Sequence, residues 1–232
     1  MFFVLANFLR AALLAVAVFA IPAFFALPAY AEDSRDRPVS LVPSGPAGMT
    51  AARMLIESSG AIKNVKATFP GVADQLQRLA QNDPFLRNVK FDVRQMALRL
   101  LQEGEEEFLT EAAKAYAAHL TADEMQRLSA FFRGPLGARF QLLPQAFAAN
   151  HNVDRKKAFD EATTSVGFSP AEKVELGAYM TTADCQKFLS SQPPILAIMK
   201  ETATRWSTRI AKKILDAAAR ERNAQPGASA RS

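Results

Sequence analysis

The sequence predicts an all-α fold, a compact multi-helix domain that follows a cleaved N-terminal signal peptide. Three observations support this prediction. Apolar residues recur at helical spacings from residue 49 onward, two complete helix-capping signatures occur, and no alternating apolar run of strand length follows residue 31. The chain has 232 residues, of which 49% are hydrophobic, and this is enough apolar material for one packed domain.

Residues 1–31 have the composition of a secretory signal peptide. Arg10 supplies positive charge, residues 11–27 are almost wholly apolar, and an Ala-Tyr-Ala cleavage motif ends at Ala31. We therefore expect cleavage before Glu32 and export to the periplasm. The alternative is an uncleaved segment that anchors the protein in the inner membrane, because the apolar stretch approaches the length needed to span a bilayer.

Composition divides the rest of the chain into a tether, a helical domain and a tail. Residues 32–48 are rich in Pro, Gly and Ser and are predicted to be a disordered tether. Residues 49–223 form the predicted helical domain, with halves at residues 49–150 and 151–223. Residues 224–232 are predicted to be a disordered tail.

Capping residues and helix breakers predict where helices begin and end in the domain. Thr50 is expected to cap a helix that ends at Gly60, and the Pro-Gly pair at Pro70 is expected to bend or break the next helix. Asp83, with the proline after it, is expected to begin a third helix. The last long helix is expected to span Pro194–Asn223.

Residues 120–144 contain the best-formed helix start in the sequence. The pattern Thr121-x-x-Glu124 predicts a capping box, in which each residue's side chain bonds the other's backbone N–H. An apolar helical stripe follows, and Gly134 is expected to end the helix in the left-handed conformation. Pro135 is expected to begin a second helix, so this stretch is predicted to be a helical hairpin.

Residues 168–193 repeat this pattern 48 positions later. Ser169-x-x-Glu172 keeps the capping box, and residues 182–185 replace the Gly-Pro-Leu-Gly break. Other aligned pairs of like chemistry are Leu128 with Leu176, Ala130 with Ala178, Phe131 with Tyr179, Arg139 with Lys187 and Phe140 with Phe188. We interpret the second stretch as a degenerate copy, so the domain is predicted to contain two related helical halves.

The first of these stretches resembles the signature of a bacterial family called domain of unknown function 2059. The resemblance covers roughly residues 49–150. The residues that carry it are Tyr116, Ala117, Ala118, His119, Leu120, Thr121, Glu124, Leu128, Phe131, Phe132, Gly134, Pro135, Gly137 and Pro144. Phe132 stands where the family usually has tyrosine, and Gly134 where it has serine. The resemblance implies an exported, all-helical protein and no known activity.

The sequence offers few groups for catalysis or metal binding. Its two histidines, His119 and His151, have no second ligand at helical spacing. Cys185 is the single cysteine, and it aligns with Gly137 at a position of tight packing, so we interpret it as a buried thiol; the alternative is an intermolecular disulfide. We therefore predict no catalytic residue, no metal site and no cofactor.

Carboxylates receive a structural interpretation as well. Glu124 and Glu172 are explained by their caps, although together with Asp184 they are the candidates for an acid–base site. The acidic run Glu103–Glu111 is interpreted as the solvated start of a helix, where negative charge complements the helix dipole.

Positive charge is concentrated near the C-terminus. The formal net charge is +5, and residues 200–232 carry eight basic and three acidic side chains. The body is therefore nearly neutral, which argues against a nucleic-acid partner. An amphipathic helix with a basic face is suited to an anionic membrane surface, with Trp206 at the interface. We favour the other interpretation, in which its apolar stripe packs inside the protein and its basic side chains are solvated. The basic residues in question are Lys200, Arg205, Arg209, Lys212 and Lys213.

These observations support three hypotheses of function. The first is a non-catalytic binding or interaction protein of the cell envelope. The alternatives are a peripheral membrane protein that uses the basic C-terminal helix and an envelope hydrolase whose site is not recognisable from sequence. The sequence identifies neither a partner nor an oligomeric state.

Overall fold

The computed structural model describes residues 45–143, 146 and 155–224, and these residues form helices and no strand. The predicted fold class is therefore confirmed. The signal peptide, the tether up to residue 44, and residues 225–232 lie outside the described residues. The helices are α2 (Pro46–Ser58), α3 (Ala61–Asn82), α4 (Val93–Glu103), α5 (Glu105–His119), α6 (Ala122–Arg133), α7 (Pro135–Phe140), α9 (Arg155–Ser165), α10 (Pro170–Met180) and α11 (Ala183–Asn223).

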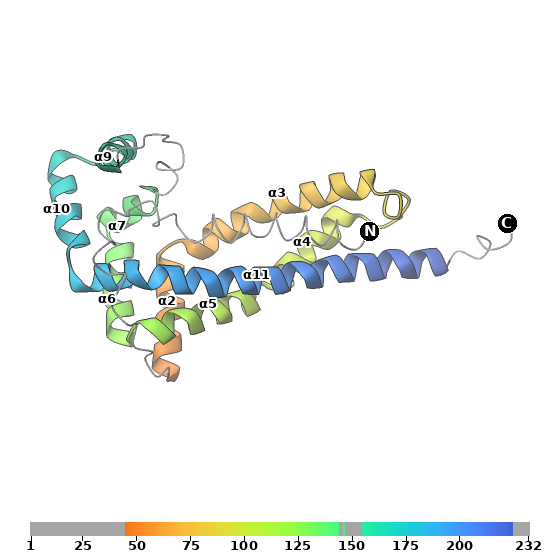
Figure 1. Ribbon diagram of the computed structural model, residues 1–232, viewed down its shortest axis with the longest axis horizontal. Helices are drawn as coiled ribbons and strands as arrows, with labels where there is room; N and C mark the ends of the chain where they lie inside the picture. The colour runs from red at the N-terminus through yellow and green to blue at the C-terminus, as the bar shows by residue number, and fades with distance from the viewer. Residues whose placement is uncertain (1–44, 144–145, 147–154, 225–232) are drawn as a thin grey trace.

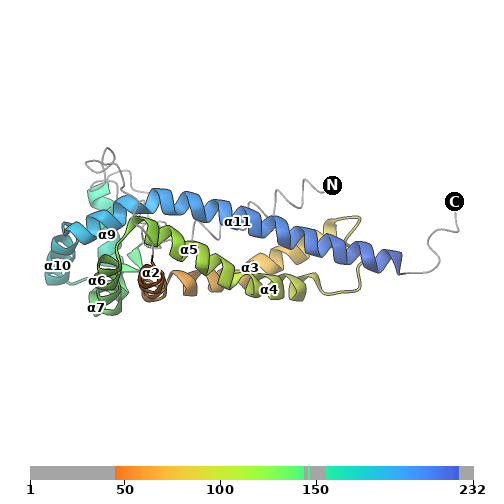
Figure 2. The same ribbon diagram turned by 90° about the horizontal axis from the view of Figure 1, so that it is seen from below.

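The molecule is elongated, and α11 runs along its long axis (Figure 1). Helix α5 packs beside α11, and α2 packs against both α5 and α6. Helices α6, α7, α9 and α10 gather at one end of the molecule, whereas α3 and α4 pair and extend toward the end where α11 terminates (Figure 2). Among the described helices, none combines the length and apolarity that crossing a bilayer requires.

The long helix α11 is continuous where the sequence predicted a boundary. The expected start at Pro194 is wrong, because α11 begins at Ala183 and continues through Pro193 and Pro194 for 41 residues. Two prolines inside a helix cost several kcal/mol in lost hydrogen bonds and steric clash. Burial offsets this cost, since the apolar stripe is buried on both sides of the prolines. Its members include Phe188, Ile195, Met199, Trp206, Ile210 and Ile214.

The N-terminal boundary of the domain also differs from the prediction. Helix α2 begins at Pro46, inside the predicted tether of residues 32–48, with Gly45 as its N-cap. Thr50 does not cap the helix, because it lies inside the first turns and its hydroxyl donates to the carbonyl of Pro46 at 3.1 Å. Proline is favoured at the first helical position, where its missing N–H is not needed. The helix does end before Gly60, as predicted, and Gly60 takes the left-handed conformation, with φ 70°.

At Pro70 the sequence predicted a bend or a break, and the helix does not break there; the predicted helix start at Asp83 is wrong. Helix α3 continues through Pro70, because the flanking residues Phe69 and Val72 are buried in the core and hold the helix together. Asp83 does not open a helix; its carboxylate accepts from the backbone N–H of Phe85 at 2.8 Å in a turn. The next helix, α4, is capped instead by Asp92, which accepts from the N–H of Gln95 at 3.0 Å.

Gly137 is required by the close approach of α7 to the end of α6. A Cβ added at Gly137 would overlap the carbonyl oxygen of Phe131 and the backbone of Phe132. These are backbone atoms, so relief would require a shift of the whole helix. Gly177 in α10 differs, because a Cβ there would meet nothing within 4 Å.

Gly137→Ala and Gly177→Ala should therefore change stability in opposite directions. We expect Gly137→Ala to lower the free energy of unfolding by about 1–3 kcal/mol, the usual cost of overpacking. Gly177→Ala should raise it by about 0.5–1 kcal/mol, because alanine has the higher helix propensity. Urea denaturation followed by far-UV circular dichroism measures both. Equal effects of the two substitutions would contradict the packing described for Gly137.

Candidate functional site

Two helical hairpins occupy one end of the molecule. The first hairpin is residues 121–140, formed by α6 and α7, and the second hairpin is residues 169–188, formed by α10 and the first turns of α11. Gly134 caps α7 from an extended conformation, with φ −74° and ψ 163°, so the predicted left-handed conformation is wrong. The reason is that a residue before proline is driven to extended backbone. Thr182 is the equivalent N-cap in the second hairpin.

Both predicted capping boxes are formed. In the first hairpin, the N–H of Thr121 donates to the Glu124 carboxylate at 2.7 Å, and the N–H of Glu124 donates to the Thr121 hydroxyl at 3.3 Å. In the second, the N–H of Ser169 donates to Glu172 at 2.9 Å, and the N–H of Glu172 donates to the Ser169 hydroxyl at 3.3 Å. The two starts are therefore structurally equivalent.

The capping carboxylate of each hairpin also pairs with a basic residue of the other hairpin. Lys187 Nζ lies 2.7 Å and 2.8 Å from the two carboxylate oxygens of Glu124. Arg139 forms a bidentate pair with Glu172, with Nη1 at 2.9 Å from Oε2. Arg139 aligns with Lys187 and Glu124 aligns with Glu172, so the two contacts are mirror copies of one another. Reciprocity of this kind is the property of a two-fold interface.

Phe131 and Tyr179 stand at equivalent positions and stack on each other. Their ring centroids are 3.5 Å apart and the ring planes differ by 7°. Residues that contact their own equivalents lie on a two-fold axis, so a local pseudo-two-fold axis passes through this stack. Phe132 packs its ring edge to face against Phe188, which belongs to the second hairpin, at 5.7 Å. The predicted repeat is thus also a packing unit.

One ion pair and the lengths of the two hairpins depart from the symmetry. Arg127 pairs with Asp184 through Nε at 2.5 Å and Nη2 at 2.9 Å, whereas the equivalent positions hold Glu175 and Leu136. The first hairpin also ends after α7, whereas the second continues into the length of α11. This continuation joins the pseudo-symmetric unit to the elongated body.

The acidic run at the start of α5 does more than complement the helix dipole. Three consecutive glutamates pair with three different helices, and sequence reasoning did not predict these partners. Glu105 pairs with Lys66 of α3 at 3.0 Å, Glu106 with Arg53 of α2 at 2.5 Å, and Glu107 with Arg209 of α11 at 2.5 Å. Neighbouring residues on a helix point about 100° apart, which is why one turn reaches three neighbours.

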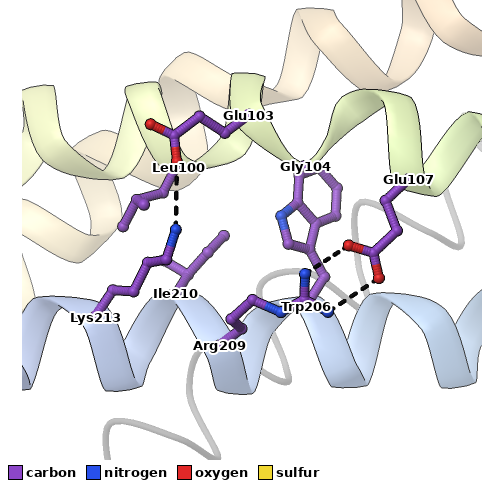
Figure 3. A pocket seen from close by; sticks show the side chains of 8 residues that line it. All are labelled: Leu100, Glu103, Gly104, Glu107, Trp206, Arg209, Ile210 and Lys213. Atoms are coloured by element: carbon purple, nitrogen blue, oxygen red, sulfur yellow. Dashed lines mark hydrogen bonds and ion pairs between the residues drawn. The ribbon is translucent and has the colours of Figure 1, made fainter.

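A cavity of about 70 Å³ lies between the α4–α5 junction and α11, shown in Figure 3. The Glu107–Arg209 pair and the pair of Lys213 with Glu103, at 3.3 Å, flank it. Ligand pockets usually enclose about 300–1,000 Å³, so this cavity suits a few water molecules. Its lining residues are Leu100, Glu103, Gly104, Glu107, Trp206, Arg209, Ile210 and Lys213.

Trp206 is buried in the body and does not lie at an exposed interface. Its relative exposure is 5%, and its ring contacts Phe69 at 5.8 Å and Phe108 at 5.7 Å. A Cβ at Gly104 would overlap the indole, so glycine is needed there for close packing. The apolar stripe of α11 therefore faces the protein core, which confirms the interpretation favoured from the sequence over the one that places Trp206 at a membrane surface.

The basic residues of α11 fall into two groups. Arg205, Arg209 and Lys213 form ion pairs, with Glu201, Glu107 and Glu103 respectively. Lys200 and Lys212 are exposed and have no ion pair within the part of the chain that the structure describes. Of these five residues, only Lys200 and Lys212 are thus unpaired and available to an external anion.

The remaining candidate groups are buried. His119 is 7% exposed, its Nδ1 has no hydrogen-bond partner, and burial lowers its pKa. Cys185 is buried as a free thiol, as predicted, and burial raises its pKa to about 12. Thiol reactivity requires the thiolate, so this cysteine is poorly suited to nucleophilic chemistry. In the described ranges no group of three or more His, Cys, Asp or Glu could hold a metal ion; His151 and the cleavage residues Ala31 and Glu32 lie outside them.

Two of the three candidate acid–base carboxylates, Glu124 and Asp184, are stabilised in their charged form. Burial favours a higher pKa for Glu124, but hydrogen bonds from Lys187 and Thr121 outweigh it and lower the pKa. The hydrogen bond from Arg127 likewise lowers the pKa of Asp184. A general acid needs a raised pKa, so these environments favour a structural role.

Comparison with known proteins gives one match. Residues 106–148 match the model of a family described as uncharacterized proteins conserved in bacteria (DUF2059). This is the family that the first hairpin resembles in sequence, and the match confirms that resemblance over this segment. The matched segment includes α5, α6 and α7, and the second hairpin lies outside it. No curated protein and no solved structure matches the chain.

The lowered carboxylate pKa values predict a pH dependence of stability. The folded-state pKa values of Glu107, Glu124 and Asp184 lie below their ordinary values of 4.5, 4.5 and 3.8. Their contribution is therefore present above those ordinary values and is lost as the pH falls through the folded-state values. We expect the free energy of unfolding to decrease between about pH 5 and pH 3 in urea titrations. Glu124→Gln should flatten this dependence, and an unchanged slope would contradict it.

Proposed function

We propose that this chain is a non-catalytic binding protein of the bacterial cell envelope. The observation that carries the proposal is the use of the polar groups in the family-like segment. Thr121 and Glu124 form a cap, Glu124 and Arg139 bind the second hairpin, and Arg127 binds Asp184. Groups that could perform chemistry are thus used to build a rigid scaffold, which supports a role in binding through its surface.

Export is part of the proposal and rests on residues 1–31. We expect signal peptidase to cleave between Ala31 and Glu32 and the mature chain to reach the periplasm. Intact-mass measurement of the protein from a periplasmic fraction should give the mass of the chain that begins at Glu32. Recovery of the full-length chain in the inner-membrane fraction would show instead that residues 1–31 are an anchor.

A binding function requires a surface that contacts another macromolecule in the cell. Met54 and Val174 are large apolar side chains with exposures of 37% and 75%. We expect a photo-crosslinking amino acid at position 54 or 174 to give a discrete adduct in living cells. The buried position Leu128 serves as the control and should give none. The absence of an adduct at both exposed positions would contradict the binding function.

A peripheral membrane role is a second candidate, and the exposed cations at the far end of α11 favour it. Lys212 and Arg220 are exposed, and the loop before α4 adds Arg87 and Lys90 beside them. The loop and the helix are joined, since the N–H of Lys90 donates to Glu221 at 2.8 Å. Basic residues near an anionic bilayer contribute about 1 kcal/mol each.

Vesicle co-sedimentation tests this second candidate. We expect Lys212→Glu with Arg220→Glu to weaken binding to phosphatidylglycerol vesicles by at least about fivefold per reversed charge at low salt. Lys63→Glu serves as the control because Lys63 is exposed and belongs to the start of α3. Figure 1 shows that α3 starts far from the end of α11 along the molecule. Equal binding by the wild type and the double variant would remove the electrostatic version of membrane association.

A further inference from the structure

The reciprocal contacts define the kind of partner that the first hairpin fits. Its surface presents a carboxylate at Glu124, an aromatic ring at Phe131 and a cation at Arg139. The second hairpin contacts these three groups with a cation at Lys187, a ring at Tyr179 and a carboxylate at Glu172. In a two-fold interface the same patch serves on both sides, so a surface of this kind is complementary to a copy of itself.

Replacing the second hairpin by another first hairpin preserves this set of contacts. Glu124 would meet the Arg139 of the other copy, Arg139 would meet its Glu124, and the two Phe131 rings would stack on the axis. The cross-hairpin pair of Arg127 with Asp184 would be lost, because the position of Asp184 holds Leu136 in the first hairpin. The other cross-hairpin contacts named above keep their chemistry.

The buried hydroxyl of Tyr179 is a second, independent observation. This oxygen is inaccessible to solvent and has no hydrogen-bond partner, so the second hairpin is an imperfect occupant of the surface. An unsatisfied buried polar group destabilises its own packing. The first hairpin has Phe131 at the equivalent position and carries no such hydroxyl.

We propose that the first hairpin is a self-association surface. The second hairpin occupies it within the chain, and the first hairpin of a second copy of this chain occupies it when the second hairpin is displaced. The chain is in this sense an internal dimer. This inference goes beyond the proposed binding function and does not depend on it, since it concerns contacts between copies of the chain.

Charge reversal on the second hairpin tests the proposal in the full mature chain. Glu172→Arg with Lys187→Glu places like charges against Arg139 and Glu124 and leaves the first hairpin unchanged. We expect the variant to form a species with twice as many chains as the wild type. The fraction of this species should rise with protein concentration in sedimentation velocity. A third substitution, Phe131→Asp, places two carboxylates together on the axis and should abolish that association.

The geometry of the new contact has its own readout. A further variant combines the two charge reversals with Cys185→Ser and Phe131→Cys. We expect it to form a disulfide between two chains, because a residue on a two-fold axis meets its own copy. A charge-reversed variant that remains helical by circular dichroism, and that stays in the wild-type association state at every concentration, would overturn the proposal.

A second measurement decides the matter if the charge-reversed variant fails to fold. Tyr179→Phe converts the axis position to the residue of the first hairpin, and we expect the melting temperature to rise. Tyr116→Phe is the matched control: its hydroxyl bonds Gln192 at 3.4 Å, so its loss should lower the melting temperature. A fall in melting temperature for Tyr179→Phe would show that the surface does not fit a first-hairpin residue, and would overturn the proposal.

Discussion

The contact between the two hairpins is the constraint on which this end of the molecule depends. Glu124 and Glu172 each satisfy the backbone at a helix start and then reach a cation of the other hairpin. Each carboxylate therefore fixes the start of its own helix and the position of its neighbour together. The stack of Phe131 on Tyr179 joins the same two hairpins, and the four paired side chains are between 17% and 38% exposed. Partly shielded ion pairs of this kind are screened less by salt than exposed ones.

The rest of the fold follows from the extension of one hairpin. Helix α11 leaves the pseudo-symmetric unit and continues for the length of the molecule, with its apolar stripe against α5. The glutamates at the start of α5 pair with Arg53 of α2, Lys66 of α3 and Arg209 of α11. These pairs are exposed and each contributes at most about 1 kcal/mol, so burial of the α11 stripe holds the body together and the ion pairs set the orientation of its helices.

Local signals in the sequence predicted the local structure. The capping boxes at Thr121 and Ser169 and the helix end before Gly60 are properties of a few neighbouring residues, and the repeat follows from comparing two such patterns. The features that were not predicted depend on residues that are far apart in the sequence. Pro70 and Pro194 lie inside helices because distant core residues bury the flanking turns, and propensity does not include that burial.

The same distinction applies to the candidate site. The chemistry of Glu124, Arg139 and Lys187 was visible in the aligned repeats, but their cross-pairing depends on how the two hairpins pack. The position of Trp206 was left between a membrane surface and the protein core, because an amphipathic stripe does not say what it faces. Its neighbours Gly104 and Phe69 come from other helices, so only the tertiary structure shows that the stripe is internal.

The central claim is that the two hairpins form one reciprocal unit, and double-mutant cycles test it most directly. One cycle combines Glu124→Gln with Lys187→Met, and the other combines Glu172→Gln with Arg139→Met. Each cycle subtracts the free-energy cost of the lost cap, so the coupling energy that remains belongs to the ion pair. We expect favourable coupling energies of about 0.5–1 kcal/mol in both cycles, with the same sign and similar size. Coupling in one cycle and none in the other would contradict the two-fold relation between the hairpins.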